Sequence, residues 1–209
     1  MVSDRLPQSF YLGEDVVFLA KALLGNVLVT EFNGQRSAGR IVETEAYRGP
    51  DDRACHAFNN RRTPRTEVMF GPGGHAYVYL CYGIHHLFNI VTGPEDAAHA
   101  VLIRGVEPLD NLALMLERRH LTKPAPPLTA GPGALAQALG IRIIHSGLPL
   151  FAPESPIWLE DRGLTPSPES IVAGTRVGVE PAGACALRPW RFSIKGSPWV
   201  SRAKGAPTP

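Results

Sequence analysis

Lysine is scarce in this chain of 209 residues, and acidic residues are missing from its C-terminal part. No lysine lies between positions 21 and 123, so this region has no amine nucleophile for Schiff-base chemistry. No Asp or Glu follows Glu180, whereas five basic residues do: Arg188, Arg191, Lys195, Arg202 and Lys204. A basic segment of this kind can bind phosphate, or it can be a solvated tail.

Cysteine and long apolar runs are also rare. The three cysteines, Cys55, Cys81 and Cys185, fit no zinc or redox spacing, and their odd number is typical of a reducing compartment. No apolar segment approaches the roughly 20 residues that span a bilayer, and the first ten residues lack the pattern of a secretory signal. The sequence therefore predicts a protein of the cytoplasm, or of the nucleus in a eukaryote, without a membrane span.

The residues that are abundant predict one domain rich in turns. Hydrophobic residues make up 44% of the chain, which is enough for a core, while 21 Gly and 20 Pro indicate many irregular connections. Strands interleaved irregularly with helices favour an α+β fold with a largely antiparallel sheet. We expect a single domain over residues 1–209, with flexible ends at 1–10 and 203–209.

Periodicity and turn signals predict the individual elements. A helix should begin near Asp15 and end at Gly25, and Asn33-Gly34 should form the two-residue turn of a hairpin. The proline-rich segment 120–133 should be an ordered loop. Further helices are predicted within 111–119 and 131–141, and further strands within 75–83, 100–108, 176–180 and 191–196.

One predicted strand carries two acids and a tyrosine. Alternation along "IVETEAY" puts Ile41, Glu43, Glu45 and Tyr47 on one face, and carboxylates two residues apart on a strand lie about 7 Å from each other. Like charges at that distance raise one pKa, which suits proton transfer if the face is partly buried. A solvated strand face is the common alternative.

Aromatic residues and histidines gather in "HAYVYLCYG". Tyr77 and Tyr79 share a face, while Tyr82 has the other parity and precedes Gly83, where the strand must turn. Such rings can stack on a nucleobase, or they can belong to an ordinary amphipathic strand. His56, His75, His85 and His86 have no spacing typical of a zinc site.

Familiar catalytic motifs are absent. The chain has no G-x-S-x-G elbow, no phosphate-binding P-loop and no dinucleotide-binding glycine pattern. With no lysine near the acids, a carboxylate that activates water is the simplest remaining mechanism. A sugar glycosidase that uses Glu43 and Glu45 as an acid–base pair stays open at this point.

Several segments together resemble the alkyladenine (3-methyladenine) DNA glycosylase family. The longest is "GRIVETEAYRGPDDRACHAFNNRRTPRTEVMFGPGGHAYVYLCYGIHHLFNIV", followed in order by "AVLIRGVEPL", "GPGALAQALGI", "RVGVE" and "RFSIKGSPWVS". The resemblance extends from about Leu12 to Ser201 and, without a long basic N-terminal extension, points to a minimal bacterial-type member.

The resemblance implies a compact α+β domain around a curved antiparallel sheet, and an enzyme of base excision repair. A monofunctional hydrolase of this kind flips alkylated or deaminated purines out of duplex DNA, namely 3-methyladenine, 7-methylguanine, hypoxanthine or ethenoadenine. Water then cleaves the N-glycosidic bond and leaves an abasic site, with no metal or other cofactor. We expect a monomer whose partner is damaged double-stranded DNA, associated with the nucleoid in a bacterium.

Residue roles follow from the same resemblance. Glu45 is expected to activate the water, with Arg104 holding that carboxylate and the nucleotide backbone. Tyr47 and Tyr79 would sandwich the flipped base. The remaining expectations are a hydrogen bond from His56 to the base, a pocket floor at Asn89 that disfavours guanine, and a wedge at Tyr82 that fills the gap in the duplex.

Two features depart from the vertebrate-type pattern. His85 and His86 follow the wedge where bulkier or apolar residues are common, and the loop at 92–100 is slightly longer, so both can alter the choice of lesion. Three other readings remain: an RNA-directed or single-strand nucleic-acid-binding protein, a sugar glycosidase, and a structural DNA-binding domain.

Overall fold

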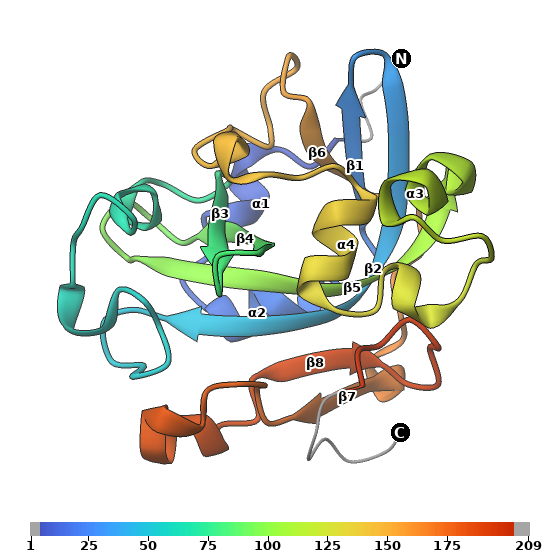
Figure 1. The fold of residues 1–209 in the computed structure, drawn as a ribbon. Helices are drawn as coiled ribbons and strands as arrows, with labels where there is room; N and C mark the ends of the chain where they lie inside the picture. The colour runs from blue at the N-terminus through green and yellow to red at the C-terminus, as the bar shows by residue number, and fades with distance from the viewer. Residues whose placement is uncertain (1–4, 203–209) are drawn as a thin grey trace.

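The computed structural model describes residues 5–202, and an eight-stranded sheet forms the centre of this part (Figure 1). Six strands follow the order β3-β4-β5-β2-β1-β6, β8 joins β2, and β7 joins β8. All these pairings are antiparallel. The single α+β domain predicted from the sequence is confirmed. The strands are β1 (Val27–Phe32), β2 (Gln35–Arg48), β3 (Ala76–Cys81), β4 (His85–Thr92), β5 (His99–Asp110), β6 (Ile157–Glu160), β7 (Ile171–Gly174) and β8 (Arg191–Ile194).

The hairpin of β1 and β2 turns where the sequence predicts it. Asn33 and Gly34 both have positive φ, 54° and 74°, as a type I′ turn requires. Phe32 therefore pairs with Gln35, and the pairing continues to Val27 and Arg40. This register fixes which residues of β2 reach the middle of the sheet.

Strand β2 divides the sheet. Its first half pairs with β1, whereas Glu43, Thr44 and Glu45 pair with β8 on that same side, and β5 runs along the other side. The pairing with β5 shifts register between Ile41 and Glu43 and again between Glu43 and Thr44. Bulges of this kind re-aim side chains. Ile41 accordingly packs in the main core, and the unbroken alternation predicted from Ile41 to Tyr47 is wrong at its first residue.

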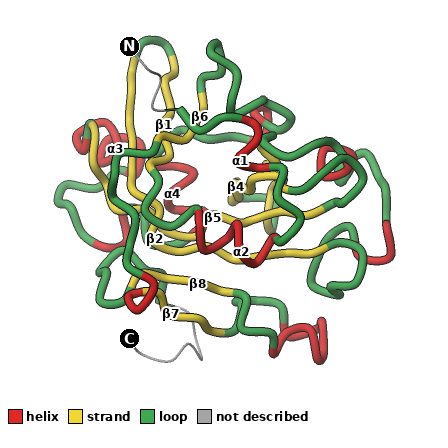
Figure 2. Tube along the Cα trace, turned by 180° about the vertical axis from the view of Figure 1, so that it is seen from behind, coloured by secondary structure: helices red, strands yellow, loops and turns green. Residues whose placement is uncertain are grey.

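Short helices pack against the sheet. The α-helices are α1 (Gln8–Tyr11), α2 (Val16–Ala22), α3 (Leu112–Arg119) and α4 (Pro132–Ala138). Asp15 caps α2 as predicted, because its side chain accepts the N–H groups of Val17 and Phe18. Helix α2 packs on β2 and β5, α4 packs on β4 and β5, and buried residues of both helices belong to the main hydrophobic core (Figures 1 and 2). Short 3₁₀ segments lie at Phe58–Asn60, Glu67–Phe70, Pro126–Leu128, Ile143–His145, Pro168–Ser170 and, with a kink at Gly183, Glu180–Leu187.

Some elements differ from the sequence predictions. Residues 176–180 do not form a strand, because this segment bends and its polar groups bind β2 and the loop after it. Strands β4, β6 and β7 were not predicted. Residues 5–10 were expected in a flexible end, yet Leu6 is buried and α1 begins at Gln8. The remainder of both expected ends, 1–4 and 203–209, lies outside the described residues.

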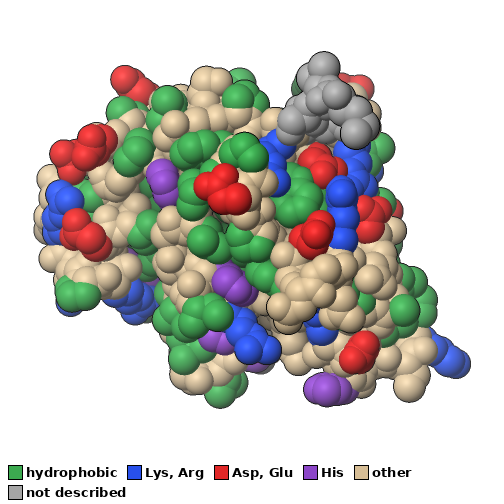
Figure 3. All heavy atoms as spheres, turned by 90° about the horizontal axis from the view of Figure 1, so that it is seen from above, with side chains coloured by type: hydrophobic (Ala, Val, Ile, Leu, Met, Phe, Trp, Pro, Cys, Tyr) green, Lys and Arg blue, Asp and Glu red, His purple; other side chains and the backbone are tan. Residues whose placement is uncertain are grey.

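The helices and the surface charge give two further observations. No helix within residues 5–202 has the length and apolar character that a membrane span needs. Acidic and basic side chains are interspersed on the face seen from above, which carries no broad field of one sign (Figure 3). On this face, charge is therefore organised only in local clusters.

Candidate active site

Glu43 and Glu45 of β2 lie buried around one arginine of β5. Both glutamates are 0% exposed, and Arg104 is 6% exposed. The Nε atom of Arg104 is 3.1 Å from Oε1 of Glu43 and 3.4 Å from Oε1 of Glu45. The structure thus brings Glu45 and Arg104 together, and a solvated strand face is excluded for these acids.

Glu43 is enclosed by donors from three segments. Besides Arg104, its carboxylate accepts hydrogen bonds from Arg191 NH1 at 3.2 Å and from the backbone N–H and hydroxyl of Ser201 at 2.7 and 2.9 Å. Gly105 leaves room for this arrangement, because a Cβ there would lie 2.5 Å from the carbonyl oxygen of Trp199. Glu43 is therefore the counterion of two buried arginines, and a symmetric acid–base pair is not what the geometry presents.

Glu45 has fewer partners and a different environment. Its Oε2 accepts the Tyr47 hydroxyl at 2.7 Å, and its Oε1 accepts the Val177 N–H at 2.8 Å. Burial raises the pKa of Glu45, although Arg104 and these two hydrogen bonds oppose the shift. A buried carboxyl whose proton affinity is raised is a better base than an exposed one.

A cavity of about 540 Å³ opens beside Glu45. Glu45 itself is behind the wall, but the three groups bound to it, Tyr47, Arg104 and Val177, all line the cavity. The structure gathers every other residue predicted for the site around the same space: Tyr47, His56, Tyr79, Tyr82, Asn89 and Arg104. These residues come from β2, β3, β4, β5 and two loops, so the sheet assembles the site.

His56 is neutral and engaged at both ring nitrogens. Nε2 lies 3.2 Å from Arg65 NH2, which can only donate, so Nε2 accepts and the proton is on Nδ1. Nδ1 lies 2.8 Å from the Tyr77 hydroxyl. Burial, followed by the charge of Arg65, lowers the pKa of His56 to about 4. The expected hydrogen bond between this imidazole and a base therefore requires Arg65 to release Nε2, which can then accept a donor of the base.

Two tyrosine rings on the cavity wall each have an arginine guanidinium group stacked over them. Arg176 lies 4.7 Å from the ring centre of Tyr47, and Arg65 lies 4.8 Å from that of Tyr79. Such contacts fix the planes of the rings and show that their faces attract cations. Tyr79 also meets the His56 ring edge-on, with centroids 4.7 Å apart.

Asn89 is almost fully buried, whereas Tyr82 is almost fully exposed. Asn89 is 4% exposed, and its amide nitrogen donates to the carbonyls of Tyr77 and Leu87, which fixes the amide in the wall. Tyr82 is 91% exposed at the β3–β4 turn, where its φ is 51° and Gly83 has φ of 73°. The loop-tip position predicted for Tyr82 is confirmed.

Sequence reasoning missed the loop that supports Glu45. Arg176 binds Asp52 with two hydrogen bonds, one of them 2.8 Å long, and donates to the carbonyl of Ala46 at 2.8 Å. These bonds fix residue 176 so that the next N–H, that of Val177, meets the carboxylate. The sequence signal for this loop was Gly178, because glycine readily adopts a positive φ. Its φ of 72° in the structure suits a bend and not a strand.

Comparison with known proteins gives consistent matches along almost the whole chain. The family model described as methylpurine-DNA glycosylase matches residues 9–198. Several bacteria have proteins named "Putative 3-methyladenine DNA glycosylase" that are similar to this chain. That of Chlamydia abortus is 47% identical over 90% of this chain and 97% of its own length. Those of Anaeromyxobacter dehalogenans and Bacillus cereus are 49% and 45% identical, each over 95% of this chain and over 86% and 99% of their own lengths.

Proposed function

Because the chain belongs to the methylpurine-DNA glycosylase family, we propose that it removes damaged purines from duplex DNA by hydrolysis of the N-glycosidic bond. The observation that carries this proposal is the buried Glu45 carboxylate directly behind the wall of an aromatic cavity, bound to Tyr47 in that wall. Inside the stack the glycosidic carbon is out of reach, so the damaged nucleotide must first be flipped into that cavity.

In the proposed reaction Glu45 removes a proton from a water molecule while the water oxygen attacks C1′ of the flipped nucleotide. Oε2 has one hydrogen bond, from Tyr47, which leaves a lone pair for the water. The bond from C1′ to the purine nitrogen breaks and its electron pair leaves with the base. The products are the departing purine, which is neutral if it was cationic in DNA and otherwise takes a proton from water, and a sugar that bears a hydroxyl at C1′. Arg104 and the Val177 N–H hold the carboxylate in position.

The cavity walls suit a flat, electron-poor ring. Tyr47 and Tyr79 would stack on the base, and each stacked base is worth about 1–3 kcal/mol. Purines alkylated at N3 or N7 carry positive charge, which tyrosine faces attract. The fixed amide of Asn89 would exclude the exocyclic amine of guanine from the cavity floor.

Tyr82 would enter the duplex. Its ring is exposed at a tight turn that projects next to the cavity, so it can fill the gap which a flipped nucleotide leaves. Flipping costs a few kcal/mol, and the cost is lowest for weakened or mismatched pairs. Selection of damage would thus begin before the base reaches the cavity.

The acid side of the pH–rate profile should report Glu45. The carboxyl must be ionised to accept a proton, and burial raises its pKa above the ordinary 4.5, so the rate should fall as pH falls through this raised value. Because the pKa of His56 is lowered to about 4, this group should titrate only at the acid end of the range. Base release measured under single-turnover conditions between about pH 4 and 8 tests this expectation. A rate that stays constant down to pH 4.5 would contradict it.

The proposal itself is tested with duplex oligonucleotides that contain hypoxanthine, ethenoadenine or 3-methyladenine. We expect alkali-labile abasic sites at the lesion and none in undamaged duplex. The same lesions in single-stranded DNA and in RNA form the comparison, because an RNA-directed or single-strand binder would prefer those. No release from any of the duplexes would refute the proposed function.

A further inference from the structure

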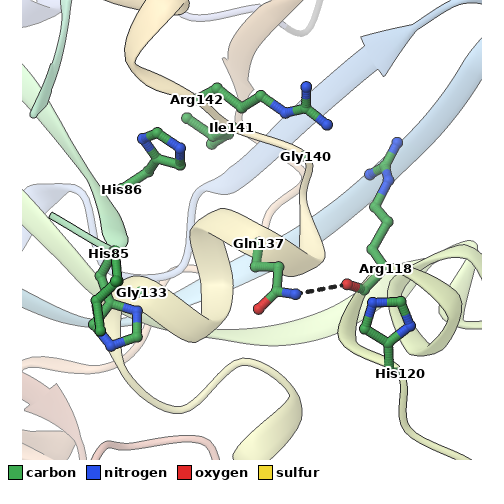
Figure 4. A pocket seen from close by; sticks show the side chains of 10 residues that line it. His85, His86, Arg118, His120, Gly133, Gln137, Gly140, Ile141 and Arg142 are labelled. Atoms are coloured by element: carbon green, nitrogen blue, oxygen red, sulfur yellow. Dashed lines mark hydrogen bonds between the residues drawn. The ribbon is translucent and has the colours of Figure 1, made fainter. Parts of the chain in front are cut away.

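A second cavity, of about 370 Å³, lies on the other side of the β3–β4 turn. Its wall combines the start of β4, the end of α3, helix α4 and the loop after α4. Figure 4 shows His85 and His86 on one side of Gln137, and Arg118 and His120 on the other, with Arg142 above. None of the residues given a role in flipping or base release lines this cavity.

The turn between β3 and β4 separates the two cavities. Tyr82 lines the cavity beside Glu45, while Ile84, two residues later, lines the second one. Both tips are exposed, 91% and 71%. Helix α4 makes the same division, because Pro132 faces the first cavity and Gly133 the second. A molecule into which this turn inserts would therefore extend over both cavities.

The second cavity is lined by cations and hydrogen-bond donors. No Asp or Glu is among its lining residues. Within the described residues, neither Arg118 nor Arg142 has a carboxylate within ion-pair distance. Arg142 is exposed, whereas Arg118 is held by the Ser37 hydroxyl and the Ala138 carbonyl. A basic hollow without acids favours an anion.

The histidines add directed donors. Nδ1 of His86 accepts the N–H of Ile143 at 3.2 Å, so in the neutral ring the proton is on Nε2. Gly133 lets His85 pack closely against α4, since a Cβ at residue 133 would lie 3.1 Å from His85. The local structure thus keeps both imidazoles at the cavity.

From this arrangement we propose that the second cavity binds a backbone phosphate of the DNA strand opposite the damaged nucleotide. This inference rests on the proposed function, because it takes the β3–β4 turn to enter duplex DNA. A wedge in the duplex has the flipped nucleotide and its strand on the side of Glu45. The backbone on the far side of the wedge belongs to the complementary strand, and Arg142, Arg118 and the two histidines meet it there.

Binding to DNA that carries a stable abasic-site analogue tests the proposal. The variant combines Arg142→Gln with His85→Ala, both exposed positions, and thermal unfolding checks that it is folded. We expect about tenfold weaker binding to duplex and a decrease of about one in the slope of log affinity against log salt concentration. Binding of the lesion strand alone should stay within about twofold of wild type. Arg142→Lys should retain the wild-type salt slope.

Arg36→Gln is the matched control, because it removes the same charge on the β1–β2 hairpin, pairs with Glu160 and lines neither cavity. Its duplex affinity should equal that of wild type. An equal loss on duplex and single strand would overturn the strand assignment, and no loss on either would overturn the site. In the latter case, if inorganic phosphate shifts the His86 ring resonances of wild type but not those of the variant, the cavity is a free-phosphate site instead. Because binding is measured without catalysis, failure of base release by wild type would refute the proposed function and not this site.

Discussion

Glu45→Gln is expected to abolish base release while the protein still binds lesion-containing duplex. A positioned general base contributes about 10²–10⁴-fold to a rate, and an amide cannot accept the proton of the attacking water. The replacement has the same shape, and its amide can still meet Tyr47 and Val177. Single-turnover release from a hypoxanthine duplex measures the loss, and binding to an abasic-site analogue measures what is retained.

The stability of this variant should not fall with its activity. Burial raises the pKa of Glu45, which means that the folded state disfavours its ionised form at neutral pH. A neutral amide removes that cost. We therefore expect the urea midpoint of Glu45→Gln to be at or above that of wild type. Such a result is typical of a residue that serves catalysis and not stability.

Glu43→Gln provides the matched control two residues away. Glu43 neutralises two buried arginines, so its loss should cost about 3 kcal/mol of stability, in line with breaking a buried ion pair. The folded fraction should still release base at a measurable rate. If Glu43→Gln lost all turnover while Glu45→Gln kept it, the assignment of the base would have to be reversed.

Local sequence signals predicted the parts of the fold that depend on local chemistry. Asn33-Gly34 and Asp15 specify a turn and a helix start through their own backbone and side-chain preferences. Strand β4 was missed because "HHLFNIVT" shows no regular alternation of polar and apolar residues. Its strand conformation is stabilised by pairing with β3 and β5. Segment 176–180 has the composition of a strand, but its contacts with Asp52 and Glu45 bend it.

The candidate site shows the same division. Periodicity correctly brought Glu43, Glu45 and Tyr47 close together, but it could not distinguish the two acids. Their difference comes from partners far away in the chain, Arg191 and Ser201 for Glu43 and Val177 for Glu45. The expected hydrogen bond from His56 to the base was assigned by resemblance, and the engagement of its ring by Arg65 depends on a loop whose path no local signal defines.

Asp52→Ala should have the largest effect on stability, about 3–5 kcal/mol, because it leaves a buried guanidinium without its counterion. Asp52 is 0% exposed and Arg176 is 5% exposed. The remaining hydrogen bonds of Arg176, to the carbonyls of Ala46 and Cys185, are too few to compensate the charge. For a domain of this size the loss corresponds to a decrease in Tm of roughly 10 °C.

The neighbouring Asp51 supplies the control for this prediction. It pairs with Arg48 at 2.6 Å, but the two side chains are 50% and 42% exposed, so Asp51→Ala should cost no more than about 1 kcal/mol. Urea unfolding of both variants gives the comparison, and equal losses would contradict it. Since Arg176 also fixes the Val177 N–H on Glu45, Asp52→Ala should in addition slow base release at temperatures where the variant is still folded. A variant that is destabilised but fully active would show that Glu45 keeps its position without this support.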